Sequence, residues 1–165
     1  MSDQTRAMIE QIHATPAMIV LVVTGGGATA IGELLGVAGA SSTVLEATVP
    51  YARTALAGWL DRSDGGADAE AALDMAMVAH RRAVELAAGH APVFGVACTA
   101  ALATLRDRRG SDRAHIAAVG DGAVIAQHLR LERTDGREVQ ERLVSDAVLA
   151  MVAKACGVVP AEPQA

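Results

Sequence analysis

The 165-residue sequence contains very few aromatic side chains: one tryptophan, one tyrosine and one phenylalanine. Hydrophobic residues nevertheless make up 52% of the chain, so the core must be built from alanine, valine, leucine, isoleucine and methionine. This composition favours alanine-rich helices packed closely on a sheet of β-branched residues. The length is sufficient to bury a proper core, and we expect one domain over residues 1–165.

Cysteine is also scarce. Cys98 and Cys156 are the only two, both lie in apolar stretches, and neither belongs to a CxxC or Cys/His spacing. Their arrangement argues against a structural zinc site. We expect two buried free thiols in a reducing compartment, and neither a metal ion nor another cofactor.

Clustered positive charge is missing as well. The net charge is −5, and the densest basic group, within residues 106–113, is interrupted by Asp107 and Asp112. A nucleic-acid surface would need a continuous basic face. The chain also shows no signal-peptide pattern at residues 1–15 and no apolar run long enough for a membrane span. We therefore expect a cytoplasmic protein that binds neither nucleic acid nor membrane.

Helical and strand-like patterns alternate along the sequence. The hairpin-like turn Gly120-Asp121-Gly122 separates the last two strands. Strands separated by helices, together with one hairpin, indicate an α/β layered domain with a mixed sheet. The expected helices are 3–13, 28–36, one from Pro50 through 52–60, one from a cap at Asp64 or Asp68 to Ala88, and 136–155; the expected strands are 17–23, 42–48, 92–98, 114–119 and 123–131.

Two helices carry apolar residues at helical spacing, which predicts their buried faces. The predicted inward residues of the long central helix are Leu73, Met77, His80, Val84 and Ala87. Those of the last helix are Val139, Leu143, Ala147, Met151 and Val152.

Residues 17–51 contain the most informative segment. The apolar run Ile19–Val23 leads directly into Thr24-Gly25-Gly26-Gly27, and a helical pattern follows. Glycines at the end of a buried strand allow a ligand to approach the backbone, and the next helix would direct its free N–H groups at an anion there. The segment Gly25–Ala30 also satisfies GxGxxA, with Glu46 about twenty residues on, so a Rossmann-type dinucleotide site is one interpretation. A tight turn without a ligand is another.

A third interpretation comes from resemblance. Thr24-Gly25-Gly26, the bend Gly39-Ala40-Ser41-Ser42, and Val49-x-Tyr51 resemble the CinA C-terminal domain family, also known as nicotinamide-mononucleotide amidohydrolase. The family pattern has an ES-x-TGG loop, a GAS/GSS bend and a V-x-Y-x-N-x-x-K helix start.

The resemblance continues over nearly the whole chain. Its further segments are Met75-Ala76, Pro92–Ala97, His115–Val119 and Gly136-Arg137-x-Val139. It implies a three-layer α/β/α sandwich with a mixed, mostly parallel sheet.

The resemblance also implies a site. Ser41, with Ser42 as a one-residue alternative, matches the hydroxyl that acts as nucleophile or orients the substrate beside a lysine. Tyr51 matches a substrate-contacting tyrosine, and Arg137 matches the arginine that holds the nucleotide phosphate, a role that suits a guanidinium. Thr24, Gly25, Gly26 and Gly27 would supply backbone donors around the ligand.

Several positions depart from the family pattern. Leu56 stands where the family has lysine, Leu21 replaces the glutamate, and Cys98-Thr99 ends the family's GxAGP loop. A serine hydroxyl needs a neighbouring base. The remaining candidates for that base are Glu46, which could instead pair with Arg53, and the histidines His80, His115 and His128.

Two functional hypotheses follow. The first is an amide hydrolase of the nicotinamide-nucleotide type that uses Ser41, with a role in pyridine-nucleotide salvage. The second is a non-catalytic domain that binds a pyridine nucleotide or a similar phosphorylated small molecule, or serves as an oligomeric scaffold. In both cases we expect a homo-oligomer, because the alanine- and methionine-rich helix faces need cover.

Overall fold

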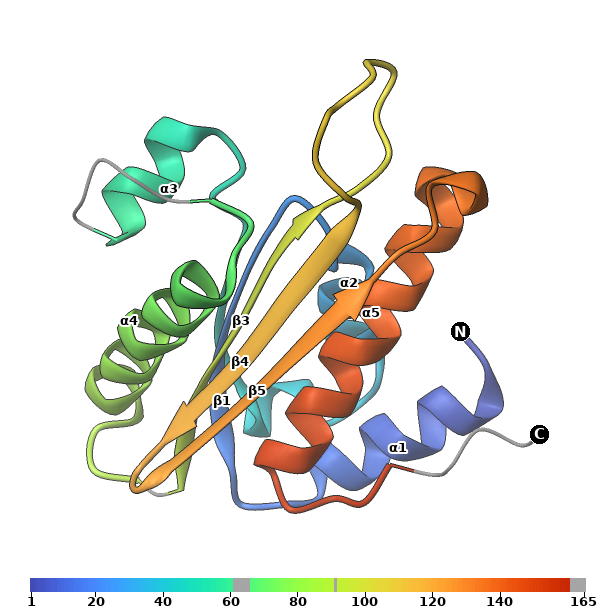
Figure 1. Cartoon of the computed structure of the whole chain (residues 1–165). Coiled ribbons are helices and arrows are strands. Elements are labelled where there is room, and N and C mark those ends of the chain that lie inside the picture. The colour runs from blue at the N-terminus through green and yellow to red at the C-terminus, as the bar shows by residue number, and fades with distance from the viewer. Residues whose placement is uncertain (61–65, 91, 161–165) are drawn as a thin grey trace.

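A five-stranded sheet with helices on both faces forms the core of the molecule (Figure 1). The computed structural model describes residues 1–60, 66–90 and 92–160. Its helices are α1 (Asp3–His13), α2 (Ala28–Gly36), α3 (Arg53–Leu60), α4 (Ala69–Ala87) and α5 (Gly136–Ala155), with short 3-10 turns η1 (Ala40–Ser42) and η2 (Arg133–Asp135). Its strands are β1 (Met18–Thr24), β2 (Val44–Thr48), β3 (Val93–Ala101), β4 (Arg113–Gly120) and β5 (Ala123–Arg130).

The strand order is β2-β1-β3-β4-β5. Strand β1 pairs in parallel with both β2 and β3, whereas β4 is antiparallel to β3 and to β5. Four strands therefore run in one direction and β4 runs against them. The carboxyl ends of β1, β2 and β3 meet at one edge of the sheet, where α/β folds usually place their ligands.

Two apolar clusters fill the spaces between the sheet and its helices. One unites α1, α2 and α5 with one face of the sheet, and the other unites α3 and α4 with the opposite face. Figure 1 shows these layers from left to right as α4, the sheet and α5. The three-layer α/β/α architecture and the mixed, mostly parallel sheet are confirmed.

The buried face of helix α4 is only partly the predicted one: Ala87 is buried, and Leu73 and His80 are half-buried. Met77 and Val84 are 46% and 49% exposed, while alanines and one methionine form the buried side. A Cβ on Gly95 of β3 would lie 2.2 Å from the carbonyl oxygen of Ala76, so the helix backbone approaches the strand very closely. Such a contact needs small residues, so the larger side chains of α4, Met77 and Val84, lie on its exposed side. The buried residues of α4 are Ala71, Ala72, Met75, Ala76, Ala79, Ala83 and Ala87.

Helix α5 has the predicted bounds, but its inward face is only partly the predicted one. Met151 and Val152 are buried, whereas Val139 and Leu143 are 49% and 43% exposed. The buried face also contains two polar residues, Gln140 and Ser145, both 0% exposed. Hydrogen bonds turn these polar side chains inward, and that rotation moves the first apolar residues of the helix to its surface.

Other differences concern helix starts. Helix α3 begins at Arg53, so Pro50 precedes the helix rather than forming its first turn. Asp68 caps α4, and its carboxylate accepts a 2.8 Å hydrogen bond from the backbone N–H of Ala71. The alternative cap, Asp64, lies outside the described residues. None of the helices within the described residues is both long and apolar enough to cross a membrane.

Candidate functional site

A pocket of about 210 Å³ lies at the edge of the sheet where the parallel strands end. The Gly25-Gly26 loop after β1, the segment from Val49 to Tyr51 after β2, and the start of α5 form its walls. At Gly25, φ is +78°, and a Cβ there would lie 1.9 Å from the carbonyl oxygen of Ala100. Only glycine fits this close turn.

Arg137 provides the positive charge of this pocket. Its Nη2 donates to the hydroxyl of Tyr51 at 3.1 Å, and its Nη1 donates to the carbonyl oxygen of Ala103, also at 3.1 Å. The predicted pair Tyr51 and Arg137 is thus brought together from segments 86 residues apart. Within the described residues Arg137 has no carboxylate partner, so its charge is available to an anion.

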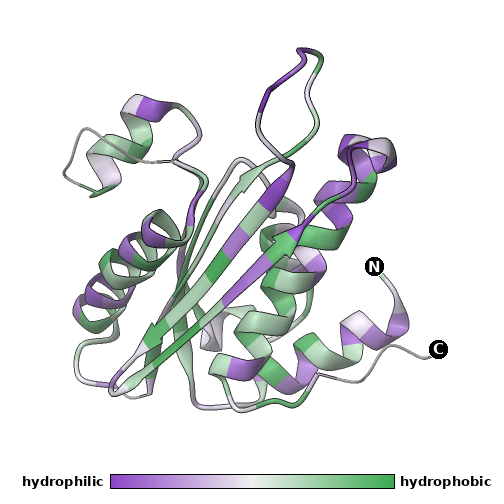
Figure 2. Cartoon of the chain, in the orientation of Figure 1, coloured by the Kyte–Doolittle hydropathy of each residue, from purple (hydrophilic) through white to green (hydrophobic). Residues whose placement is uncertain are grey.

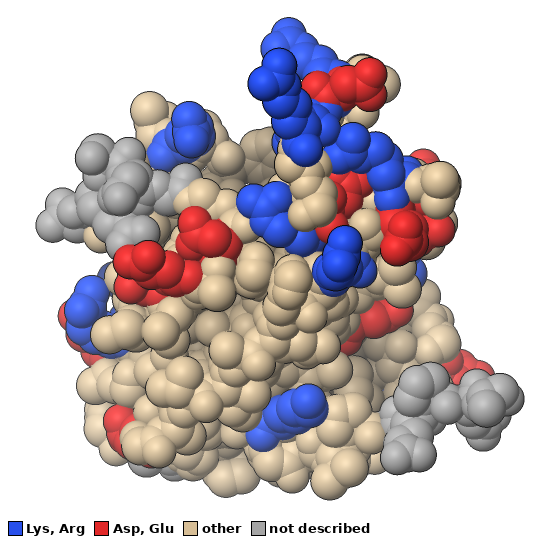
Figure 3. Space-filling view, viewed as in Figure 1, with Lys and Arg blue, Asp and Glu red and all other residues tan. Residues whose placement is uncertain are grey.

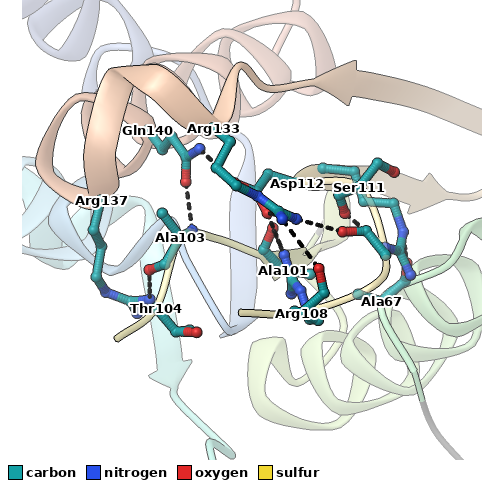
Figure 4. Close-up of polar contacts among 12 residues, drawn as sticks. Ala67, Ala101, Ala103, Thr104, Arg108, Ser111, Asp112, Arg133, Arg137 and Gln140 are labelled. Atoms are coloured by element: carbon teal, nitrogen blue, oxygen red, sulfur yellow. Dashed lines mark hydrogen bonds and ion pairs between the residues drawn. The ribbon is translucent and has the colours of Figure 1, made fainter. Parts of the chain in front are cut away.

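The orientation of Arg137 rests on a buried polar network (Figure 4). One helical turn further on, the Oε1 of Gln140 accepts a hydrogen bond from the backbone N–H of Ala103 at 2.7 Å. Arg137 and Gln140 therefore hold Ala103 by its C=O and its N–H. A guanidinium held this way is already oriented before a ligand arrives.

Asp112 is the buried acceptor of this network. Its carboxylate accepts hydrogen bonds from Gln140 at 2.9 Å, from Arg133 at 3.3 Å and from Arg108. The hydrogen bond from Gln140 is the main reason why the pKa of Asp112 lies below its ordinary value. This buried carboxylate fastens the 102–112 segment to the start of α5.

Glu141 occupies the N-terminus of α2, where the sequence predicts a bound anion. Its carboxylate accepts hydrogen bonds from the backbone N–H of Gly27 at 2.9 Å and of Thr29 at 3.0 Å. The hydroxyls of Thr29 and Ser145 donate to it as well, at 3.2 and 3.1 Å. Burial disfavours this charge, but the hydrogen bonds outweigh burial and lower the pKa of Glu141. The helix end therefore binds an anion of the chain itself.

The pocket consequently contains one charge of each sign on a single helix. Arg137 and Glu141 both line it and are four residues apart on α5. Side chains at this spacing lie on the same face, about 6 Å apart at their Cβ atoms. The two side chains do not pair with each other: Glu141 bonds to α2, whereas Arg137 bonds to Tyr51 and Ala103.

Ser41 and Ser42 lie away from this pocket. They form the turn η1 directly before β2, and Val44 at the start of β2 pairs with Ile19 near the start of β1. The glycine loop follows the other end of β1, about 16 Å further along the strand. Glu46, on β2, bonds to Arg82 of α4 at 2.7 Å and not to Arg53. The structure therefore brings none of these three residues into the pocket.

The histidines considered as bases do not converge on Ser41 either. His115 and His128 are paired across β4 and β5, with their rings stacked 4.5 Å apart. His80 faces Asp121 at 3.4 Å, in the turn between the same strands. Strand β2, which follows Ser41, forms the opposite edge of the sheet.

Apolar packing occupies two positions where the family pattern has polar residues. Leu56, at the lysine position, is 6% exposed, and Val22, at the serine position of the ES-x-TGG loop, is 0% exposed. Both belong to the same apolar cluster between the sheet and α4.

Sequence reasoning missed Glu141 and Gln140. Their spacing from Arg137 on one helix was the available signal, but their partners lie in other segments. No group of three or more histidine, cysteine or acidic residues suited to a metal ion occurs within the described ranges.

Comparison with solved structures identifies the fold. The chain is similar to the competence/damage inducible protein CihA from Agrobacterium tumefaciens, with a TM-score of 0.71, 23% identity, and coverage of 92% of this chain and 96% of that one. It is also similar to a CinA superfamily protein from Escherichia coli, with a TM-score of 0.68, 14% identity, and coverage of 93% and 92%. No protein-family model and no curated protein matches the sequence. The chain has the fold of the competence-damage-inducible (CinA) superfamily of proteins.

Proposed function

We propose that this protein binds a nicotinamide nucleotide, or a close analogue, in the pocket between the glycine loop and α5, without hydrolysing its amide. The observation that carries the proposal is the pair of opposite charges, Arg137 and Glu141, one turn apart on the pocket wall. The pocket volume of about 210 Å³ lies below the range of about 300–1,000 Å³ typical of sites that enclose a drug-sized ligand. It therefore suits part of a mononucleotide, with the rest exposed.

Nicotinamide mononucleotide carries both charges that the pocket would complement. Its phosphate is an anion, for which Arg137 offers a planar donor group. Its ring is a quaternary pyridinium cation, and the Glu141 carboxylate is a fixed negative charge on the same wall. Tyr51, which is 64% exposed, offers an aromatic face on which a cationic ring could stack.

The proposal excludes hydrolysis because of the polar side chains that line the pocket. The polar side chains among the described residues that line the pocket are Tyr51, Arg137 and Glu141. Arginine remains protonated and cannot serve as a base. Glu141 is engaged by four hydrogen-bond donors, and no serine or cysteine stands beside it in the pocket lining.

Isothermal titration with matched ligands tests the proposal. We expect nicotinamide mononucleotide to bind, and the riboside that lacks the phosphate to bind at least about tenfold more weakly. The nucleotide with its ring reduced to the uncharged dihydropyridine should bind about fivefold more weakly, since it loses attraction to Glu141. Arg137→Ala should abolish the preference for phosphate, and Arg81→Ala, an exposed arginine on α4, serves as the matched control.

Two results would contradict the proposal. Equal affinity for the nucleotide and the riboside would exclude the phosphate contact at Arg137. Release of ammonia from nicotinamide mononucleotide, lost in Ser41→Ala, would instead support the amide hydrolase.

A further inference from the structure

Strand β5 is an uncovered edge of the sheet. It is eight residues long, and its pairing with β4 is continuous from Ala123 to Arg130. In an antiparallel pair, every second residue of an edge strand directs its N–H and C=O away from the partner strand. Native proteins usually protect such an edge with proline, lysine, a bulge or a covering segment. The sequence of β5 contains neither proline nor lysine, and its register with β4 shows no bulge.

Exposed apolar side chains lie on both sides of this edge, beside the polar Gln127 and His128 in the second half of the strand. On the α4 side of the sheet, Val124 is 63% exposed. On the other side, Val139 and Leu143 of α5 are half exposed. Figure 3, which views the molecule toward β5, shows charged side chains gathered at the top and a largely uncharged face below. In Figure 2, β5 is hydrophobic near its start and hydrophilic at its carboxyl end.

Helix geometry places Leu143 on the β5 side of α5. Glu141 and Ser145 point toward α2, and Leu143 is two residues, or about 200°, around the helix from each of them. Val139 lies four residues earlier on the same face. Further along this flank, Ala147 contributes to the same apolar cluster as Ile125 and Leu129 of β5.

We propose that β5 pairs with β5 of a second copy of this chain, antiparallel and around a two-fold axis perpendicular to the sheet. Such a dimer has one continuous ten-stranded sheet, with the two α5 helices side by side on the same face. The same surface of each copy then forms both halves of the interface, as a two-fold axis requires. The unpaired backbone groups of β5 gain partners, and the exposed flank of α5 that carries Val139 and Leu143 faces the α5 helix of the other copy.

The charges at the two ends of β5 favour antiparallel over parallel pairing of the two copies. Arg130 ends the strand, is exposed, and makes no ion pair within the described residues. Asp121 lies just before the strand, with a side chain that is 85% exposed. Antiparallel pairing brings each Arg130 close to Asp121 of the other copy, whereas parallel pairing would place like charges together.

Sedimentation of the full chain over a wide range of concentration tests the interface. We expect a dimer of the 16.8 kDa chain. Val124→Lys and Leu143→Lys should each raise the dimer dissociation constant by at least about tenfold. Leu35→Lys replaces a leucine on α2 whose exposure, 54%, lies between those of Leu143 and Val124, and it should leave the dimer intact. Circular dichroism melting verifies that each variant remains folded.

A charge swap tests the antiparallel register. Arg130→Asp and Asp121→Arg should each weaken the dimer, and the double variant should restore it. A wild-type monomer at all concentrations overturns the proposal. A dimer that tolerates both lysine substitutions, or that the double variant fails to restore, overturns it as well.

Discussion

Asp112 is a nearly fully buried carboxylate whose partners hold the pocket wall in place. It accepts hydrogen bonds from Gln140, Arg108 and Arg133, so its loss removes an acceptor from the buried Gln140 amide and from two partly exposed guanidinium groups. We expect Asp112→Ala to lower the free energy of unfolding by about 2–3 kcal/mol, measured by urea denaturation. The exposed Asp107 in the same segment is the control, and Asp107→Ala should cost less than about 0.5 kcal/mol. Equal effects of the two substitutions would refute the role assigned to Asp112.

Glu141 makes stability depend on pH. Hydrogen bonds outweigh burial and lower its folded-state pKa below the ordinary value of 4.5. Its contribution is therefore fully present above about pH 4.5 and is lost as the pH falls through the folded pKa. Glu141→Gln should destabilise the protein by about 1–2 kcal/mol at pH 7. The difference from wild type should shrink in acid, and a difference that does not change with pH would contradict this account.

Leu56, which stands at the lysine position of the family pattern, is part of the apolar core. Its side chain packs with Val22 in the apolar cluster beneath α3 and α4. Leu56→Lys buries a charge there and should destabilise the fold by about 2–4 kcal/mol. We expect no ammonia release from the variant, since no serine or cysteine stands among the described residues that line the pocket. Thr54→Lys, on an exposed position of α3, is the matched control for stability, and hydrolysis by the Leu56 variant would overturn this view.

At the level of whole elements, Gly95 determines how α4 packs on the sheet. A Cβ on Gly95 would collide with the α4 backbone at Ala76 and His80. Gly95→Ala should therefore destabilise the protein by about 3 kcal/mol or more. Gly32 is exposed within α2, and a Cβ added there would meet nothing within 4 Å, so Gly32→Ala should stabilise by about 0.5–1 kcal/mol. Thermal melts of the two variants should shift in opposite directions, and shifts of the same sign would contradict the packing described.

The sequence predicts element bounds better than the faces that elements bury. The bounds of helix α5, Gly136–Ala155, follow from local signals, the two glycines at its ends. The buried face of α4 is only partly predicted because alanines give a weak hydrophobic stripe, although close packing at Gly95 requires them. Glu141 cannot be assigned from sequence, since its partners Gly27 and Thr29 are more than a hundred residues away.

At the scale of the whole molecule, different candidate functional residues lie at the two ends of the parallel strands. The carboxyl edge of the parallel strands carries the glycine loop, Tyr51 and Arg137, brought together around one pocket. The amino edge carries Ser41 and Ser42, next to His13, whose ring is fixed by hydrogen bonds to Thr43 and to the carbonyl oxygen of Leu34. A ligand can therefore bind beside Arg137 without a nucleophile at Ser41 or Ser42.

A nuclear magnetic resonance titration of the ¹⁵N-labelled protein with nicotinamide mononucleotide tests this account most directly. We expect saturable shifts of the backbone signals of Gly25, Gly26, Tyr51 and Arg137, and none at Ser41 or Ser42. Shifts centred on Ser41 and Ser42, or no saturable shift at all, would contradict the central claim that the pocket beside Arg137 binds the nucleotide.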